Sequence, residues 1–186
     1  MSLLAKTVRP ACRVPALAVV LIAYLLLPAA PAAAGDPYGP LKVLDGRWLL
    51  TLANGEKLYL TNQCARLASA FTCERLVEGS PADLEIYLPV KDTPGAYRTL
   101  ALDYAAPTPA PWSRLTIDGA HWLYESSTNE NGHPLYRRTV NDFDGPNRIR
   151  FTQERSLNGK TWETVMTGEQ ARRIIGDSLA RTRKKV

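Results

Sequence analysis

Short runs rich in β-forming residues alternate with turn signals from residue 47 to residue 167. Asn-Gly and Asp-Gly suit two-residue β-hairpins, because both central residues of a type I′ turn take positive φ. Three such dipeptides separate runs, at Asn54-Gly55, Asp118-Gly119 and Asn158-Gly159. The pattern predicts nine strands, at residues 47–53, 56–62, 84–90, 97–104, 113–117, 120–126, 135–143, 148–157 and 160–167.

Consecutive strands with short links predict an antiparallel up-and-down meander, and a meander of eight or more strands removes its edges by closing into a barrel. We therefore expect an all-β barrel domain over residues 35–173. Residues 64–77 stay ambiguous, since Leu67 and Phe71 have helical i, i+4 spacing, whereas Thr72 suits a strand.

Residues 1–34 have the pattern of a secretory signal peptide. Three basic residues precede an apolar run at residues 14–27, and small residues end at Ala34. The run is short for a bilayer span, and Cys12 precedes it, which argues against a lipid-anchored cysteine. We expect cleavage near Ala34 and a periplasmic or secreted product; a retained N-terminal membrane anchor is the alternative.

The net charge of +5 comes from the two ends of the chain. Residues 35–170 contain 14 basic and 17 acidic residues, so nothing favours a nucleic-acid-binding surface. Residues 174–186 form a basic tail, which we expect to be disordered and solvated. The alternative is a weak contact with an anionic membrane surface.

Two cysteines, Cys64 and Cys73, remain after removal of the leader. An oxidising compartment favours a disulfide between them, contributing about 2–3 kcal/mol to stability. Their spacing is unlike a zinc knuckle or a thioredoxin-type redox motif, and no His lies nearby, so no metal site is expected.

Gly46-Arg47-Trp48 opens the first predicted strand, and Arg172 and Arg173 follow the last one. This arrangement resembles the lipocalin/calycin superfamily and some exported bacterial proteins of uncharacterised type. The resemblance implies that Gly46 and Trp48 are structural and that Arg172, or Arg173, packs over the Trp to close the barrel base.

A two-residue turn at Asp118-Gly119 fixes which side chains face one another. Counted outward, Leu115 opposes Trp122 and Ser113 opposes Tyr124, and we expect these residues to face the lumen. His121 then points outward as an ordinary surface residue rather than a metal or heme ligand.

The same count at Asn158-Gly159 places Glu154 opposite Glu163. Two facing carboxylates belong in water, so Arg155 and its opposing Trp162 are expected to face inward. One arginine of the preceding strand, Arg138, is expected to face the lumen as well.

These counts predict a small-molecule site. An aromatic cup containing arginine suits an amphipathic ligand with an apolar body and a carboxylate or phosphate head. The alternative is a filled barrel that serves as a structural or interaction protein of the cell envelope. The expected ligand-binding residues are Tyr59, Trp122, Tyr124, Arg138, Phe151, Arg155, Trp162 and Met166.

No catalytic motif or cofactor-binding motif is present in the sequence. It lacks a nucleophile elbow, a P-loop, a zinc-protease helix and a dinucleotide-binding loop. The chain is similar in size to phenolic acid decarboxylases, cofactor-free barrels that use Tyr, Arg and Glu; Tyr124, Tyr136, Arg138 and Glu125 are the corresponding types here. Glu125 is expected to face outward, which counts against this activity. We therefore predict no cofactor and no enzyme, and a cofactor-free barrel enzyme is the less favoured alternative.

Overall fold

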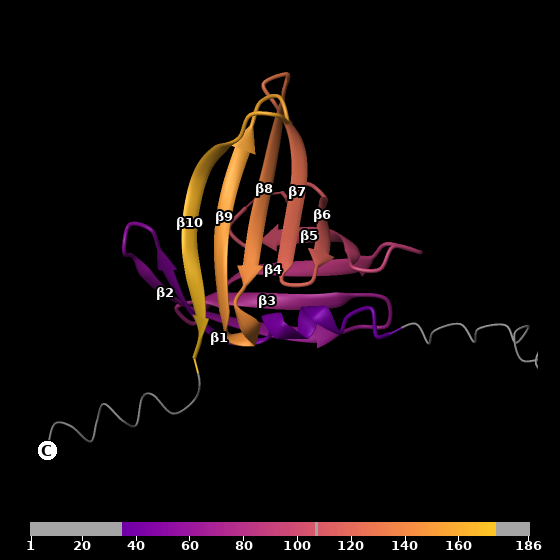
Figure 1. Ribbon diagram of the computed structural model, residues 1–186, viewed down its shortest axis with the longest axis vertical. Helices are drawn as coiled ribbons and strands as arrows, with labels where there is room; N and C mark the ends of the chain where they lie inside the picture. The colour runs from indigo at the N-terminus through magenta and orange to yellow at the C-terminus, as the bar shows by residue number, and fades with distance from the viewer. Residues whose placement is uncertain (1–34, 107, 174–186) are drawn as a thin grey trace, which may run out of the picture. The chain divides into compact units, whose positions relative to one another are not determined.

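The computed structural model describes residues 35–106 and 108–173, which form an all-β barrel (Figure 1). The predicted signal peptide and basic tail lie outside these residues. No helix in the described part of the chain has the length and hydropathy needed to cross a bilayer. The elements are η1 (Pro40–Leu44), β1 (Gly46–Leu52), β2 (Lys57–Arg66), β3 (Phe71–Val77), β4 (Ser80–Pro89), β5 (Ala96–Asp103), β6 (Ser113–Asp118), β7 (His121–Glu130), β8 (His133–Phe143), η2 (Gly145–Asn147), β9 (Arg148–Ser156) and β10 (Glu163–Arg172).

Each strand pairs antiparallel with the next, and β1 pairs with β10 to close the barrel. This topology confirms the predicted up-and-down meander. The described residues contain ten strands rather than nine, because the ambiguous residues 64–77 complete β2 and form β3. Phe71 and Cys73 alternate toward the core from β3, so burial of every second side chain decides the conformation there.

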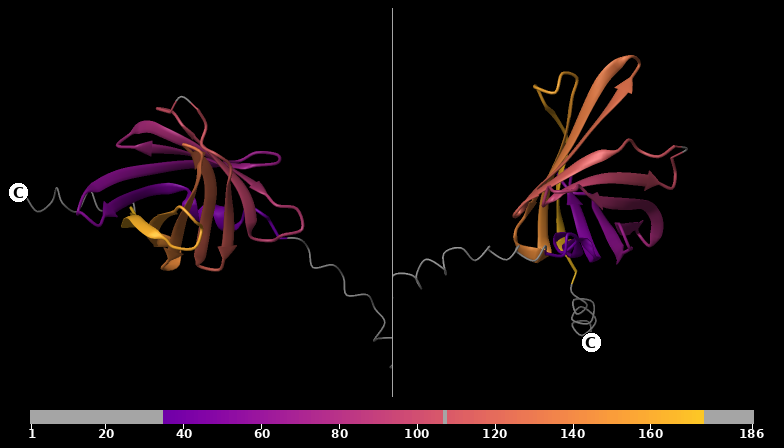
Figure 2. Two further views of the ribbon diagram at one scale, coloured as in Figure 1. Left: turned by 90° about the horizontal axis from the view of Figure 1, so that it is seen from above. Right: turned by 90° about the vertical axis from the view of Figure 1, so that its right-hand side faces the viewer.

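One end of the barrel is closed by the N-terminal arm. Tyr38, Leu41 and Leu44 of the arm and η1 are buried in the main hydrophobic cluster, together with Tyr87 and Leu115. The hairpins β7–β8 and β9–β10 rise steeply across β3–β5 and extend beyond them, as Figures 1 and 2 show. The barrel is therefore plugged at the end near η1, and its lumen opens toward the two long hairpins.

The resemblance to lipocalins rests on residues that lie together at the closed end. Trp48 is 1% exposed, and the guanidinium carbon of Arg172 lies 4.3 Å from the centre of its ring. Gly46 has φ +118°, and a Cβ there would lie 2.5 Å from Nη1 of Arg172. A side chain at residue 46 would therefore collide with the arginine that covers Trp48. Arg173 instead lies over Tyr59.

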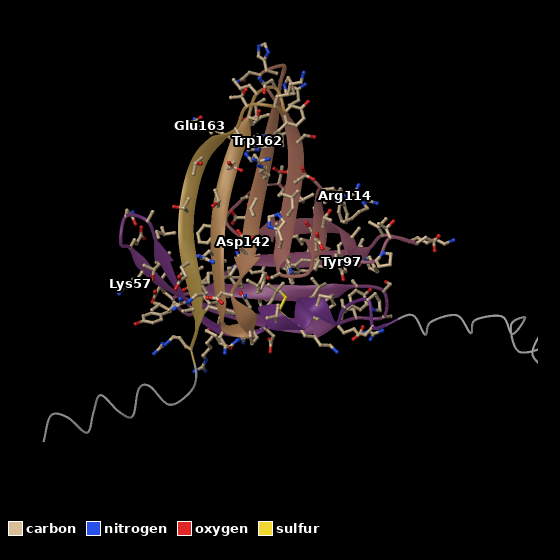
Figure 3. The ribbon with its side chains drawn as sticks, in the orientation of Figure 1. Lys57, Tyr97, Arg114, Asp142, Trp162 and Glu163 are labelled. Carbon is tan, nitrogen blue, oxygen red and sulfur yellow. A yellow bond between two sulfur atoms is a disulfide. The ribbon has the colours of Figure 1, made fainter. Side chains whose placement is uncertain are left out.

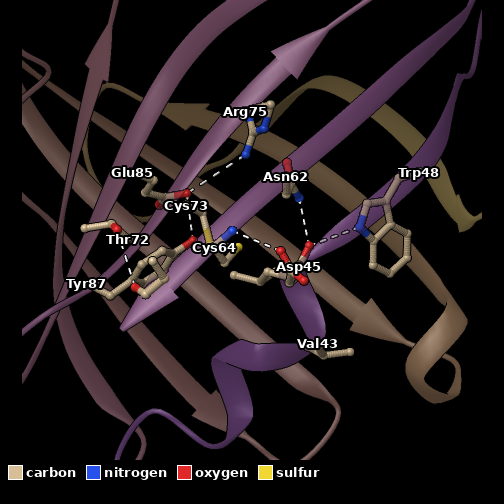
Figure 4. Close-up of a disulfide and its surroundings, with 12 residues drawn as sticks. Val43, Asp45, Trp48, Asn62, Cys64, Thr72, Cys73, Arg75, Glu85 and Tyr87 are labelled. Carbon is tan, nitrogen blue, oxygen red and sulfur yellow. Dashed lines mark hydrogen bonds and ion pairs between the residues drawn. A yellow bond between two sulfur atoms is a disulfide. The ribbon is translucent and has the colours of Figure 1, made fainter. Parts of the chain in front are cut away.

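Cys64 and Cys73 form a disulfide, which confirms the predicted pairing. The two residues oppose each other in register between β2 and β3 (Figure 4). The bond joins the strands next to the loop that connects them, and Asp45 accepts a hydrogen bond from the Cys64 N–H at 3.0 Å.

The predicted turn of the second hairpin is wrong by one residue, which shifts each pairing partner by two residues. Asp118 pairs with His121, so Gly119 and Ala120 form the turn. Gly119 has φ +55° whereas Asp118 remains in β6. Trp122 therefore opposes Ile117, not Leu115. The expected inner face survives, because the shift changes the partners but not the alternation along each strand.

The third hairpin differs more, because its connection is longer than two residues. Asn158 Oδ1 accepts hydrogen bonds from the N–H groups of Lys160 and Thr161, both at 2.8 Å, which stabilises a wide loop between β9 and β10. As a result Glu163 opposes Arg155, not Glu154. The two glutamates do not face each other, and the reason given for turning Arg155 inward was wrong.

Candidate functional site: an open cavity inside the barrel

A cavity of about 870 Å³ occupies the barrel lumen. This volume lies within the range of roughly 300–1,000 Å³ that small-molecule sites occupy. One part of the wall is apolar, with lining residues that include Leu50, Leu58, Leu60, Ile149, Phe151 and Met166. Polar residues from all parts of the barrel line the rest, and we call those on β2–β5 the polar wall.

The polar wall begins as a row of side chains across four neighbouring strands. Asn62 of β2 opposes Arg75 of β3, Arg75 opposes Asp83 of β4, and Asp83 opposes Asp103 of β5. All four residues line the cavity. Because directly opposed residues share one face of a sheet, the pairing register brings them to the lumen together.

Arg75 is the basic centre of this row. Its Nη1 lies 3.4 Å from Asp83 Oδ2, and its Nη2 lies 4.0 Å from Glu85 Oε2. Burial lowers the pKa of Arg75, but the two carboxylates outweigh that effect, and the pKa ends above its usual value. For the acidic side chains burial acts in the other direction. It raises the pKa of Glu85 and of Asp83, and the positive charge of Arg75 offsets only part of the rise.

Two tyrosines extend the cluster toward β7. The Tyr87 hydroxyl donates a hydrogen bond to Glu85 Oε2 at 2.8 Å and lies 3.5 Å from the Tyr124 hydroxyl. Burial, followed by the negative charge of Glu85, raises the pKa of both phenols. Both hydroxyls are therefore protonated at neutral pH and can donate hydrogen bonds. Figure 4 shows Tyr87, Glu85 and Arg75 beside the disulfide.

Asn62 carries a buried oxygen to which no described residue donates a hydrogen bond. The side chain belongs to a residue only 8% exposed, and its Nδ2 donates to the carbonyl oxygen of Leu44 at 3.0 Å. Its Oδ1 has no hydrogen-bond partner among the described residues. A buried acceptor left unpaired costs about 1–3 kcal/mol. Figure 4 shows this oxygen directed to the side on which Arg75 lies.

Five of the residues expected at the ligand site line the cavity: Tyr124, Arg138, Phe151, Arg155 and Met166. Trp122 instead lies in the closed-end core, with its ring 4.5 Å from that of Phe143. Tyr59 is 48% exposed under Arg173, so its assignment to the lumen was wrong.

Arg155 shares a strand face with Phe151 and borders the cavity. It lies at the exposed open end, where its Nε donates to Glu163 Oε2 at 2.9 Å. Arg137 pairs similarly with Glu130 at the same end. Each arginine is thus already bound by a carboxylate.

Arg138 borders the cavity, but Trp162 does not. Arg138 opposes and binds Glu154; the pair alternates with Phe151 along the strands, yet both of its residues border the cavity. The Trp162 ring covers Arg138, with its centre 4.1 Å from the guanidinium carbon. Figure 3 shows Trp162 and Glu163 near the end where β9 and β10 are joined. Arg138 thus borders the cavity with its guanidinium held by Glu154, whereas the predicted lumen position of Trp162 was wrong.

The decarboxylase-like set is not assembled either. Tyr124 and Glu125 border the cavity, but Glu125 opposes Arg138, which is bound to Glu154, and Tyr136 does not line the cavity. In the described residues, no group of three or more Asp, Glu, His or Cys side chains is arranged to hold a metal ion.

Sequence reasoning missed Asn62, Arg75, Asp83, Glu85 and Tyr87. The available signal was the alternation of Asp83, Glu85 and Tyr87 along one strand. On a lone strand, that polar face is expected in water.

Neither a family model nor a curated protein matches the sequence. Among solved structures, the crystal structure of Rv2717c from M. tuberculosis is similar, with 13% identity over 79% of this chain and 100% of that chain, and a TM-score of 0.43. A redesigned beta barrel has 12% identity over 72% of this chain and 94% of its own, with a TM-score of 0.29. Likeness at this level assigns no site residue.

Proposed function

We propose that this protein is exported and binds a small amphipathic molecule in the barrel lumen. The observation that carries the proposal is the open cavity of about 870 Å³, which has one apolar and one polar wall. The alternative of a filled barrel is disfavoured by this volume, because aromatic side chains that filled the lumen would leave no such space.

The two walls suit the two ends of an amphipathic molecule. Burial of each CH₂ group against the leucines, Ile149 and Phe151 would contribute about 0.8 kcal/mol. The polar end would reach the hydrogen-bonding cluster of Arg75, Glu85 and Tyr87. A few fixed polar groups in an otherwise apolar site set the orientation of a ligand.

Export is supported by two independent features. The leader has the charge and hydropathy pattern of a signal peptide, and the Cys64–Cys73 disulfide fits an oxidising compartment such as the periplasm. We further propose that the barrel is lipocalin-like, a relationship supported by the packing of Arg172 over Trp48 beside Gly46.

The experiment is to isolate the exported protein under native conditions and measure its mass before and after denaturation. We expect a small molecule to be released. A Gln153→Trp substitution fills the lumen from β9, whereas Thr152→Trp adds the same side chain on the other face of that strand. Binding should be lost in Gln153→Trp and kept in Thr152→Trp.

Two results would contradict the proposal. One is the absence of any bound molecule together with no change in melting temperature on addition of alkyl amphiphiles. The other is equal retention of ligand by both tryptophan variants, which would place binding outside the lumen.

A further inference from the structure

The polar wall contains more hydrogen-bond acceptors than donors. Asp83, Glu85 and Asp103 lie around Arg75. Asp83 of β4 directly opposes Asp103 of the neighbouring strand β5. Like charges in opposed positions are unfavourable. Arg75 is bound to two of the three carboxylates and so cannot neutralise the whole group.

The buried oxygen of Asn62 is a second and independent sign of a missing donor. The amide orientation is fixed, because the Leu44 carbonyl accepts hydrogen bonds from both Asn62 Nδ2 and Trp48 Nε1. Only the oxygen is therefore available on the Arg75 side, and in the described residues nothing donates to it (Figure 4).

An anionic head group fits this wall poorly. It would face three carboxylates and the Asn62 oxygen, and Arg75 is already paired. The arginines near the mouth, Arg137 and Arg155, are bound to Glu130 and Glu163. Arg138, which also lines the cavity, is bound to Glu154. Among the described residues, the carboxylate or phosphate head expected from the sequence therefore finds no unpaired arginine in the lumen.

We propose, building on the proposed function, that the ligand's polar end is an organic cation, a protonated amine that donates to Asn62 Oδ1 and to the carboxylates of Asp83 and Glu85. Its apolar body would lie against the aliphatic wall. The acidic side chains do not converge as metal ligands do, so an amine bearing several N–H donors suits them better than a metal ion.

Three probes with the same tail test the head group: decylammonium, decanol and decanoate. Their affinities are measured by isothermal titration calorimetry at neutral pH, below the concentrations at which they form micelles. We expect decylammonium to bind most tightly, by about tenfold or more over decanol, because hydrogen bonds to charged groups are roughly twice as strong as neutral ones.

Two matched variants locate the cation. Glu85→Gln keeps the shape and an acceptor for Tyr87 but removes one of the three carboxylates of the polar wall, and it should weaken decylammonium binding about tenfold. Glu169→Gln removes an equal charge from β10, where Glu169 pairs with Arg148 and does not line the cavity. It should leave the affinity unchanged. Asp83→Asn provides a second lumen variant should Glu85→Gln lose its cooperative melting.

The outcomes separate this inference from the proposed function. If decanoate or decanol binds as tightly as decylammonium, or if the lumen variants and Glu169→Gln weaken binding equally, the cation assignment is wrong while lumen binding stands. If none of the three probes binds, and native protein carries no small molecule, both proposals are wrong.

Discussion

Replacement of Arg172 by Ala should be among the most destabilising single changes at the protein surface. The guanidinium donates to the carbonyl oxygens of Val43 at 2.5 Å, Asp45 at 2.6 Å and Pro146 at 3.2 Å, and it covers Trp48. It therefore joins the N-terminal arm, the β8–β9 connection and the last strand.

The expected loss is about 3 kcal/mol. Hydrogen bonds to a charged group contribute about 1.5–3 kcal/mol each when buried, and a cation over an aromatic ring contributes about 0.5–2 kcal/mol. The bonds to Asp45 and Pro146 are exposed, so water replaces them at little cost once the arginine is gone. The bond to Val43 and the contact with Trp48 account for most of the loss.

The assay is urea denaturation followed by tryptophan fluorescence. Arg172→Lys should lose about half as much as Arg172→Ala, because an ammonium cannot reach several carbonyls in one plane. Arg173→Ala is the control, since its guanidinium lies over the exposed ring of Tyr59, and exposed contacts of this kind change stability by about 0.5 kcal/mol. Equal stabilities of Arg172→Ala and Arg173→Ala would refute the closing role of Arg172.

Three further results are expected. Gly46→Ala should lower stability by about 2 kcal/mol, because the new Cβ meets Arg172 and a positive φ disfavours Ala, and crystallography of the variant should find the guanidinium displaced from its ring. A Cys64→Ser/Cys73→Ser double variant should lose about 2.5 kcal/mol in the urea assay, the chain-entropy value for a short loop with a sequence separation of 9; an unchanged midpoint would contradict it. Burial raises the pKa of Glu85 in the folded state above its ordinary value of 4.5. Between 4.5 and the raised pKa the unfolded chain loses this proton more readily than the folded protein, so the free energy of unfolding falls as pH rises through this range. Glu85→Gln should show a smaller fall in urea midpoint over this range, and parallel curves for both proteins would contradict the assignment.

The fold could be predicted from the sequence because the turn signals along the chain and the need to close the sheet into a barrel favour the same topology. Turn dipeptides mark hairpins, and a long meander has one simple way to remove its edges. Register was harder to predict, since it depends on hydrogen bonds within the loops. Asn158 accepts from two backbone N–H groups beyond the predicted turn, and this wider loop changes the partner of Arg155.

The polar wall could not be predicted from any single strand. On β4, Asp83 and Glu85 face the lumen, which leaves the alternating Leu84 and Ile86 on the outer face. A lone strand with this pattern is expected to turn its aliphatic face inward. The opposite orientation is favoured because Tyr87, on the same face as the two carboxylates, packs in the core.

The contact between Arg172 and Val43 also determines where a tag or a surface can be attached to the protein. It fastens the first and last described segments of the barrel to each other at the plugged base, away from the hairpins that surround the mouth. An affinity tag, a fluorophore or a sensor surface joined next to residue 35 or residue 173 should therefore leave the route into the lumen unobstructed.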